Sequence, residues 1–119
     1  MLSRGKQAED LARRWLRKQR VKILQCNFYS RWGEIDIIAL DNNTLSFIEV
    51  RHRQSICFGT AAESVTRTKQ QRIIKTAHFY LMQHKKLEQL AARFDILSIS
   101  GDLDNPEVDW YKDAFMMIA

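Results

Sequence analysis

The stretch Gly33–Arg53, GEIDIIALDNNTLSFIEVRHR, contains the pattern that decides the fold. Two apolar runs, EIDIIAL and LSFIEVRHR, flank the tetrapeptide DNNT, whose residues favour tight turns. The two runs are therefore predicted to pair as an antiparallel hairpin. Glu34, Asp36 and Glu49 interrupt these runs, and a buried carboxylate is costly unless a charged group meets it. The hairpin is thus also a candidate site.

Apolar periodicity and turn residues outside the hairpin predict five further elements. They are a helix capped by Ser3, a strand over 21–29, a helix within 61–86, a strand over 93–100 and a strand over 107–115. In the first strand the apolar positions change phase between Ile23 and Leu24, which indicates an irregular strand. The order α-β-β-β-α-β-β predicts an α/β protein with a mixed sheet flanked by helices, in a single domain over 1–119.

The 19 basic and 14 acidic residues are unevenly distributed along the chain. Residues 1–31 contain nine basic and two acidic side chains, and residues 63–93 contain seven and two. The segment 32–58 contains two basic and four acidic side chains, and the segment 94–119 contains one and six. Two basic blocks around a weakly acidic middle are typical of a phosphate-binding surface around an acidic pocket, although solvated helix faces produce similar runs.

The composition argues against several classes of protein. The apolar runs are far shorter than the roughly 18 residues of a membrane-spanning helix, so no membrane partner is expected. The N-terminal stretch MLSRGKQAED lacks the apolar centre of a secretion signal, which favours a cytoplasmic location. Cys26 and Cys57 form no CxxC pair, so reduced thiols are expected. The three histidines lack the spacing of zinc ligands, so a structural zinc site is not expected.

The alternation of side chains along a strand sorts the residues of the first hairpin arm into two faces. Glu34 and Asp36 are predicted to share one face of this strand. The opposite face is predicted to carry three apolar residues, Ile35, Ile37 and Ala39. The arm therefore has an acidic face and a core face.

On the second hairpin arm, Glu49 and Arg51 share a face in the same way. If the DNNT turn brings this face beside Asp36, two carboxylates and a guanidinium converge at one end of the hairpin. Carboxylate oxygens suit Mg²⁺ or Mn²⁺, and such a site would support phosphoryl transfer. The alternative is a salt-bridged hairpin, in which Glu49 and Arg51 pair with neighbours across the sheet.

Six blocks of sequence carry a family resemblance. They are AEDLA, GEIDIIA, FIEVRHR, FGTAAESVTRTKQQRI, RFDIL and DAF. Together they resemble the YraN family of bacterial proteins, and GEIDIIA followed by EVR resembles the D…(D/E)xK signature of the PD-(D/E)XK nuclease superfamily. The resemblance implies a restriction-endonuclease-like core, whose α-β-β-β-α-β order agrees with the predicted elements.

The same resemblance implies roles for the acidic residues. Asp36 and Glu49 match the superfamily's metal-binding carboxylates. Glu9 matches an acidic residue in the superfamily's first helix that often completes the metal site. Glu34 is a candidate accessory residue of the same site. Arg51 stands where the superfamily usually has lysine. Because arginine stays protonated, Arg51 cannot act as a general base, but it can stabilise charge on a phosphate while the metal or Glu34 activates water.

Five basic residues are candidates for binding the phosphates of a nucleic acid. They are Arg14, Arg17, Arg53, Lys69 and Arg72. For Lys69, in the TKQQR block, the alternative is that it is an ordinary exposed helix lysine that binds no phosphate.

The function predicted from these observations is that of a nucleic-acid-binding protein with a nuclease fold, a metal-dependent endonuclease acting on branched or single-stranded DNA. One alternative is a non-catalytic nucleic-acid-binding module with vestigial carboxylates, whose binding would fall steeply with salt and ignore EDTA. Another is a protein-interaction domain whose acidic C-terminal block meets a basic partner. A homodimer is a further expectation, because cutting both strands of a symmetric junction needs two sites.

Overall fold

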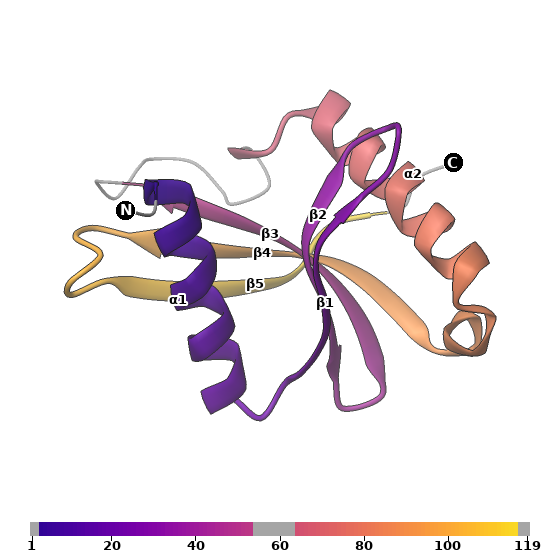
Figure 1. The fold of residues 1–119 in the computed structure, drawn as a ribbon, viewed down its shortest axis with the longest axis horizontal. Coiled ribbons are helices and arrows are strands. Elements are labelled where there is room, and N and C mark those ends of the chain that lie inside the picture. Colours follow the sequence, from indigo (N-terminus) through magenta and orange to yellow (C-terminus); the bar gives the residue numbers. More distant parts are fainter. Residues whose placement is uncertain (1–2, 54–63, 117–119) are drawn as a thin grey trace.

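Five strands form one mixed sheet with a helix against each face (Figure 1). The computed structural model describes residues 3–53 and 64–116. Its elements are α1 (Arg4–Lys18), β1 (Lys22–Tyr29), β2 (Glu34–Asp41), β3 (Thr44–Arg53), α2 (Arg67–Gln83), the short 3-10 helix η2 (Lys85–Gln89), β4 (Ala91–Ser100) and β5 (Glu107–Phe115). Strands follow the order β1-β2-β3-β4-β5, and neighbours are antiparallel except β3 and β4, which are parallel and connected through α2. The predicted mixed α/β fold and its α-β-β-β-α-β order are confirmed.

Helix α1 packs an apolar stripe on one face of the sheet. Ser3 caps the helix as predicted, accepting a hydrogen bond from the Lys6 N–H at 3.2 Å. Ala8, Ala12 and Leu16 recur at the spacing of one helical face and are at most 2% exposed. They meet apolar residues of β2, β3 and β4 in one core cluster, which leaves the other faces of α1 to charged side chains.

Helix α2 covers the opposite face of the sheet. Thr66 caps it by accepting a hydrogen bond from the Lys69 N–H at 3.2 Å, so the helix lies within the predicted range 61–86 but begins after this cap. The first residues of that range, 61–63, lie outside the described residues. The buried residues of α2 are Ile73, Thr76, Ala77 and Tyr80. Neither α2 nor any other helix in the described ranges is long and apolar enough to cross a membrane.

Strand β1 is irregular at two positions. Its pairing with β2 shifts register between Ile23 and Gln25, which confirms the predicted irregularity. Asn27 has a φ angle of 51°, a left-handed conformation that asparagine adopts more readily than most residues.

Strands β2 and β3 pair along only part of their length. Their ladder runs from the pair Asp41–Thr44, beside the turn, to the pair Ile37–Ile48. Beyond this point β2 pairs with β1, whereas β3 continues beside β4. The two strands therefore separate at Asp36, and we call this point the fork (Figure 1).

The fork changes which side chains share a face. Ile37 and Ala39 pack in the core cluster that contains α1. Ile35 instead belongs to the cluster under α2, so the prediction that it shares a face with Ile37 and Ala39 is wrong. The alternation fails at Asp36 because β2 stops following β3 there and twists with β1 instead.

A buried carboxylate ties the C-terminal half of the sheet together. Asp95 is 0% exposed and accepts hydrogen bonds from the Ser46 hydroxyl and, at 3.0 Å, from the Trp110 Nε1–H. The Arg93 Nε–H also donates a hydrogen bond to Asp95 at 3.0 Å, and the Nη2 of Arg93 donates one to Asp41 at 2.7 Å. Asp95 belongs to the acidic C-terminal block, but this network places it in the core, where a protein partner does not reach it.

Candidate metal site and nucleic-acid groove

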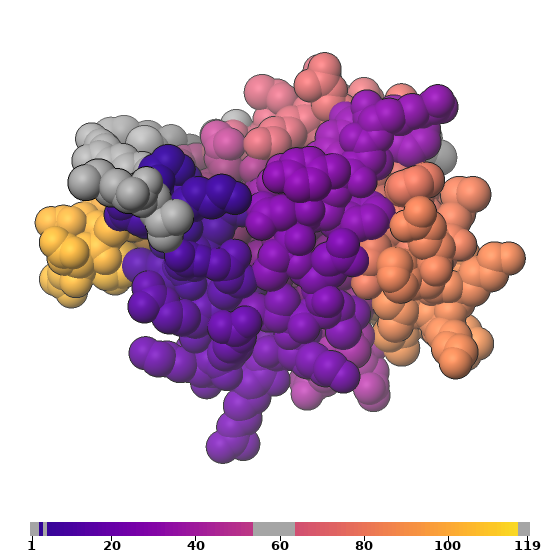
Figure 2. All heavy atoms as spheres, viewed as in Figure 1, coloured from indigo at the N-terminus to yellow at the C-terminus, as the bar shows by residue number. Residues whose placement is uncertain are grey.

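Three carboxylates meet at the fork. Glu9 reaches this point from α1, and Glu34 and Asp36 reach it from β2. One oxygen of each carboxylate lies within 4.8 Å of the others, and all three residues are half-buried. The space-filling view shows the β1–β2 hairpin (purple) directly beside α1 (indigo), which explains how residues distant in sequence come together (Figure 2). We call these three residues the carboxylate cluster.

Asn27 connects two members of the cluster. Its Nδ2 donates to Glu9 Oε1 at 2.6 Å and to Glu34 Oε1 at 3.2 Å, so one amide joins α1 to β2. The left-handed backbone of Asn27 accompanies this placement. Asn27 was not among the residues predicted from the sequence to form the site. Its one signal was an asparagine inside an apolar strand, where that residue type is disfavoured.

Asp36 lies where the two strands separate, and its carboxyl group titrates unusually. Its Oδ2 accepts a hydrogen bond from the Val50 N–H at 2.8 Å, which satisfies a backbone donor of β3 at the fork. The pKa of Asp36 is raised to about 8, first by burial and then by the charge of Glu49. The hydrogen bond with Glu34 and the charge of Glu9 contribute to this rise, and the hydrogen bond from the Val50 N–H opposes it. At neutral pH and without a cation, Asp36 is therefore largely protonated.

Glu34 behaves differently from its neighbour. Burial raises its pKa, but hydrogen bonds with Asp36, Tyr29 and Asn27 outweigh burial and hold the pKa of Glu34 below its ordinary value. The bond to Glu34 in turn raises the pKa of the exposed Tyr29 hydroxyl. The protonated carboxyl of Asp36 thus donates a hydrogen bond to the ionised Glu34. The cluster holds a proton at the place where a cation would supply positive charge.

Glu49 lies beside the cluster and pairs with a lysine. It is 5% exposed, and its Oε1 lies 2.8 Å from the Lys69 Nζ, which reaches it from α2. Glu49 was predicted to bind a metal together with Glu9 and Asp36. In the structure the three carboxylates that lie within 4.8 Å of one another are Glu9, Glu34 and Asp36, and metal binding by Glu49 stays a prediction. Glu49 still acts on the cluster, because its charge raises the pKa of Asp36.

Two predicted arginines follow Glu49 on β3. Arg51 is half-buried, and its position on the Glu49 face, inferred from strand alternation, stays a prediction. Arg53 ends the strand, where its carbonyl accepts a hydrogen bond from the Gly101 N–H at 2.9 Å. The alternative prediction was that Glu49 and Arg51 pair with neighbours across the sheet. The structure instead shows Glu49 paired with Lys69, which comes from α2.

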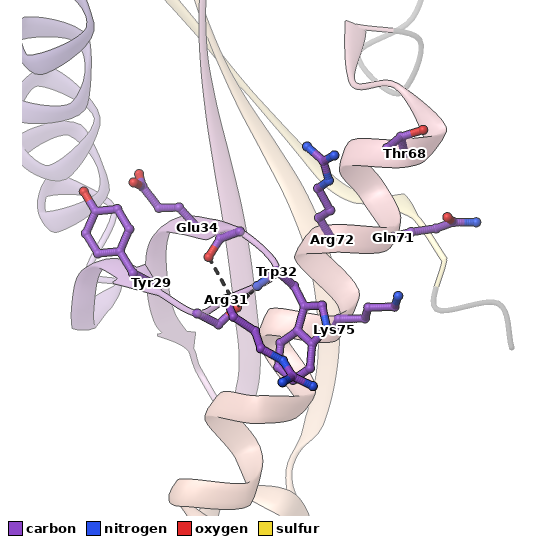
Figure 3. Close-up of a pocket in the computed structure, with 10 residues that line it drawn as sticks. Tyr29, Arg31, Trp32, Glu34, Thr68, Gln71, Arg72 and Lys75 are labelled. Carbon is purple, nitrogen blue, oxygen red and sulfur yellow. Dashed lines mark hydrogen bonds between the residues drawn. The ribbon is translucent and has the colours of Figure 1, made fainter.

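A groove of about 640 Å³ adjoins the carboxylate cluster (Figure 3). One wall is the turn between β1 and β2, and the other is α2. The lining residues are Tyr29, Ser30, Arg31, Trp32, Gly33, Glu34, Thr68, Gln71, Arg72 and Lys75. Glu34 belongs to both the groove and the cluster, so the two adjoin at this residue. The predicted phosphate-binding residue Arg72 lines this groove, whereas Arg31, Trp32 and Lys75 were not identified from the sequence.

Arg14 and Arg17 lie around a different hollow. It has a volume of about 490 Å³ and is formed by the C-terminal half of α1 together with Pro106 and Val108. Among the described residues, none lines both this hollow and the groove. The structure therefore does not bring Arg14 and Arg17 together with Arg72, and their role in phosphate binding stays a prediction.

The chain is similar to a large group of bacterial proteins. The sequence profile of an uncharacterised protein family, UPF0102, matches residues 8–99. The UPF0102 protein YraN of Salmonella arizonae is 42% identical over 108 residues, which cover 90% of this chain and 79% of that protein. A UPF0102 protein of Nitrosomonas europaea is 42% identical over 113 residues, covering 95% and 93% of the two chains. A UPF0102 protein of Saccharophagus degradans is also 42% identical over 113 residues, covering 95% and 92%. The chain thus belongs to the UPF0102 family, which includes the YraN proteins, as the sequence blocks indicated.

Proposed function

We propose that this protein is a metal-dependent endonuclease that acts on branched or single-stranded DNA. The observation that carries the proposal is the crowding of Glu9, Glu34 and Asp36 at the fork. Burial, together with neighbouring carboxylates, keeps Asp36 protonated at neutral pH, and a hard divalent cation would stabilise the ionised form of such a site. The resemblance of GEIDIIA and EVR to the nuclease signature supports the same reading.

The donor set fits Mg²⁺ or Mn²⁺. These ions take oxygen ligands, and Mg²⁺ holds them at about 2.1 Å, so ligands on opposite sides of the ion lie about 4.2 Å apart. The cluster oxygens, which lie within 4.8 Å of one another, need to move little to reach such positions. Asn27 would keep Glu9 and Glu34 oriented. When bound, such an ion neutralises charge on a phosphate and lowers the pKa of water.

Arg51 from β3 and Lys69 from α2 would act on the phosphate. Arg51 presents a permanent positive charge to the scissile group and cannot accept a proton. Lys69 brings an ammonium with three donors to the edge of the cluster, held there by Glu49. The site therefore has a lysine, supplied by α2 in place of the one that the nuclease signature has on β3. We assign to Lys69 the positioning of water or of a phosphate oxygen.

A second candidate is a nucleic-acid-binding module without catalysis. The observation that favours it is the arginine at position 51, since β3 lacks the usual lysine. In that case the groove beside the cluster would still bind phosphates, and binding would be insensitive to EDTA.

The test uses wild type and two variants with labelled single-stranded, duplex, flap and four-way DNA, in Mg²⁺, Mn²⁺ or EDTA. The Glu9→Gln variant removes one cluster charge, and Glu88→Gln makes the same change at an exposed position of η2. Cleavage by wild type and Glu88→Gln, abolished by EDTA and by Glu9→Gln, is the expected result. Binding without cleavage under all conditions would overturn the endonuclease and leave the binding module.

A further inference from the structure

The groove beside the cluster has the charge of a phosphate site. Arg31 lines it on the side of the β1–β2 turn, and Arg72 and Lys75 line it on the side of α2 (Figure 3). The two α2 residues are three positions apart, so they occupy neighbouring places on one side of the helix. Among the residues that line the groove, Glu34 is the one acid, and it lies at the end shared with the cluster. The groove therefore suits an anionic ligand that extends toward the cluster.

An aromatic ring and a guanidinium together form a platform in this groove. The Arg31 Cζ lies 4.6 Å from the centroid of the Trp32 ring. The Trp32 ring also packs edge-to-face against Phe79 of α2, with the ring centroids 6.0 Å apart and the ring planes at 65°. Trp32 is thus held against α2 while Arg31 is exposed. Aromatic rings and arginine planes are the surfaces on which proteins stack unpaired bases.

The turn that carries this platform is fixed to α2. Ser30 and Gly33 exchange two backbone hydrogen bonds, of 2.8 Å and 3.3 Å. The Ser30 hydroxyl lies 2.8 Å from the Thr76 hydroxyl of α2. A Cβ added to Gly33 would lie 3.4 Å from the Cβ of Arg72, so turn and helix are in close contact. The groove is therefore formed before any ligand arrives, which lowers the entropic cost of binding.

The size of the groove favours a single strand over a duplex. Its volume of about 640 Å³ lies in the range of sites that enclose one small organic molecule, which corresponds to a nucleotide or two. A base within a duplex is stacked and paired, so it cannot offer its face to Trp32. An unpaired base can do so at no cost of unstacking.

We infer that this groove binds an unpaired DNA strand, with one base on the Arg31–Trp32 platform and adjacent phosphates on Arg72 and Lys75. The strand then continues past Glu34, so that the next phosphodiester lies at the carboxylate cluster. This inference rests on the proposed nucleic-acid function and adds the strand-binding residues and the unpaired state of the substrate.

The test measures affinity for a labelled single-stranded oligonucleotide and for the matching duplex by fluorescence anisotropy, in EDTA so that cleavage does not interfere. Trp32→Ala should weaken single-strand binding about tenfold or more and leave duplex binding nearly unchanged, while Trp32→Phe, which keeps a ring, should restore most of the affinity. The double variant Arg72→Ala/Lys75→Ala should lower the salt slope of single-strand binding by about 1.4. Arg67→Ala, on the same helix but lining another hollow, is the matched control.

The outcomes separate this inference from the proposed function. Single-strand affinity that is unchanged in Trp32→Ala and in the double variant, with wild type still cleaving DNA in Mn²⁺, would overturn the strand groove and leave the endonuclease. Equal losses for single strand and duplex would also overturn it, because they would show a general charge effect. Arg31→Ala, which removes no core contact, should repeat the single-strand loss if Trp32→Ala does not fold. Wild type that neither binds nor cleaves would overturn both proposals.

Discussion

The replacement Asp36→Asn should stabilise the protein at neutral and alkaline pH. The amide keeps the shape of the protonated carboxyl, since its oxygen can accept from the Val50 N–H and its nitrogen can donate to Glu34. What the variant loses is the ionised form, which burial and the charge of Glu49 disfavour. A comparison with wild type therefore measures the cost of charging Asp36 in the fold.

The magnitude follows from the pKa of Asp36. Its value of about 8 in the folded protein exceeds the ordinary 3.8 by roughly four units, and each unit corresponds to about 1.4 kcal/mol. The upper limit is therefore on the order of 6 kcal/mol. Because the cluster is half-buried and can relax, we expect about 3 kcal/mol, which for a domain of this size raises the melting temperature by about 10 °C.

The raised pKa of Asp36 also predicts how the stability of the wild type changes with pH. Because the folded pKa of Asp36 is raised, the folded protein binds more protons than the unfolded chain between the two values, 3.8 and about 8. Wild type is thus most stable, in this respect, at the acid end of that window and loses stability as the pH rises through it. Urea unfolding in EDTA should show an advantage of Asp36→Asn that is near zero at the acid end and largest at the alkaline end. Asp109→Asn, at an exposed position of β5, is the control. An advantage that is absent or constant with pH would refute the crowding of Asp36.

Four further predictions test the site and its support. Mn²⁺ should raise the melting temperature more at pH 8 than at pH 6, because binding displaces the Asp36 proton; an equal rise at both would contradict this. Asn27→Gly, which suits the φ of 51°, should weaken Mn²⁺ binding at least about tenfold in calorimetry, and unchanged affinity would show that the amide does not orient the cluster. Lys69→Ala should destabilise the protein by about 2–3 kcal/mol in urea unfolding by leaving Glu49 buried without its partner, and Glu49→Gln in the same chain should recover most of the loss. Asp95→Ala should cost about 3–5 kcal/mol, since it removes the common acceptor of a buried network; a loss below about 1 kcal/mol would place that network outside the stable core.

Local patterns predicted the elements well where neighbouring residues decide the structure. The Ser3 cap, the hairpin around DNNT and the strand Glu107–Phe115 are all present as expected. In each case the deciding interaction joins residues close in sequence, such as a cap to a helix N–H or one strand to the next across a turn. The irregularity of β1 near Leu24 was visible for the same reason, since the apolar phase changes within a few residues.

Patterns of this kind failed where a strand changes its partner. Ile35 was placed on the wrong face because β2 follows β3 only as far as Ile37. Arg31 and Trp32 could not be predicted as groove residues, because the groove forms only where the turn packs against α2. Arg14 was grouped with other basic residues by charge, although it lines a different hollow from the one that Arg72 lines.

The sequence by itself determined the α/β class, the order of elements, the family and a set of candidate acidic residues, because these depend on periodicity, caps and short motifs. The tertiary structure alone decided that Glu34 joins Glu9 and Asp36, while Glu49 pairs with a lysine from α2. The physical reason is that carboxylates are placed by the point where two strands separate and by the helices packed on each face. Those positions arise from the packing of the whole sheet and from contacts between residues far apart in the chain.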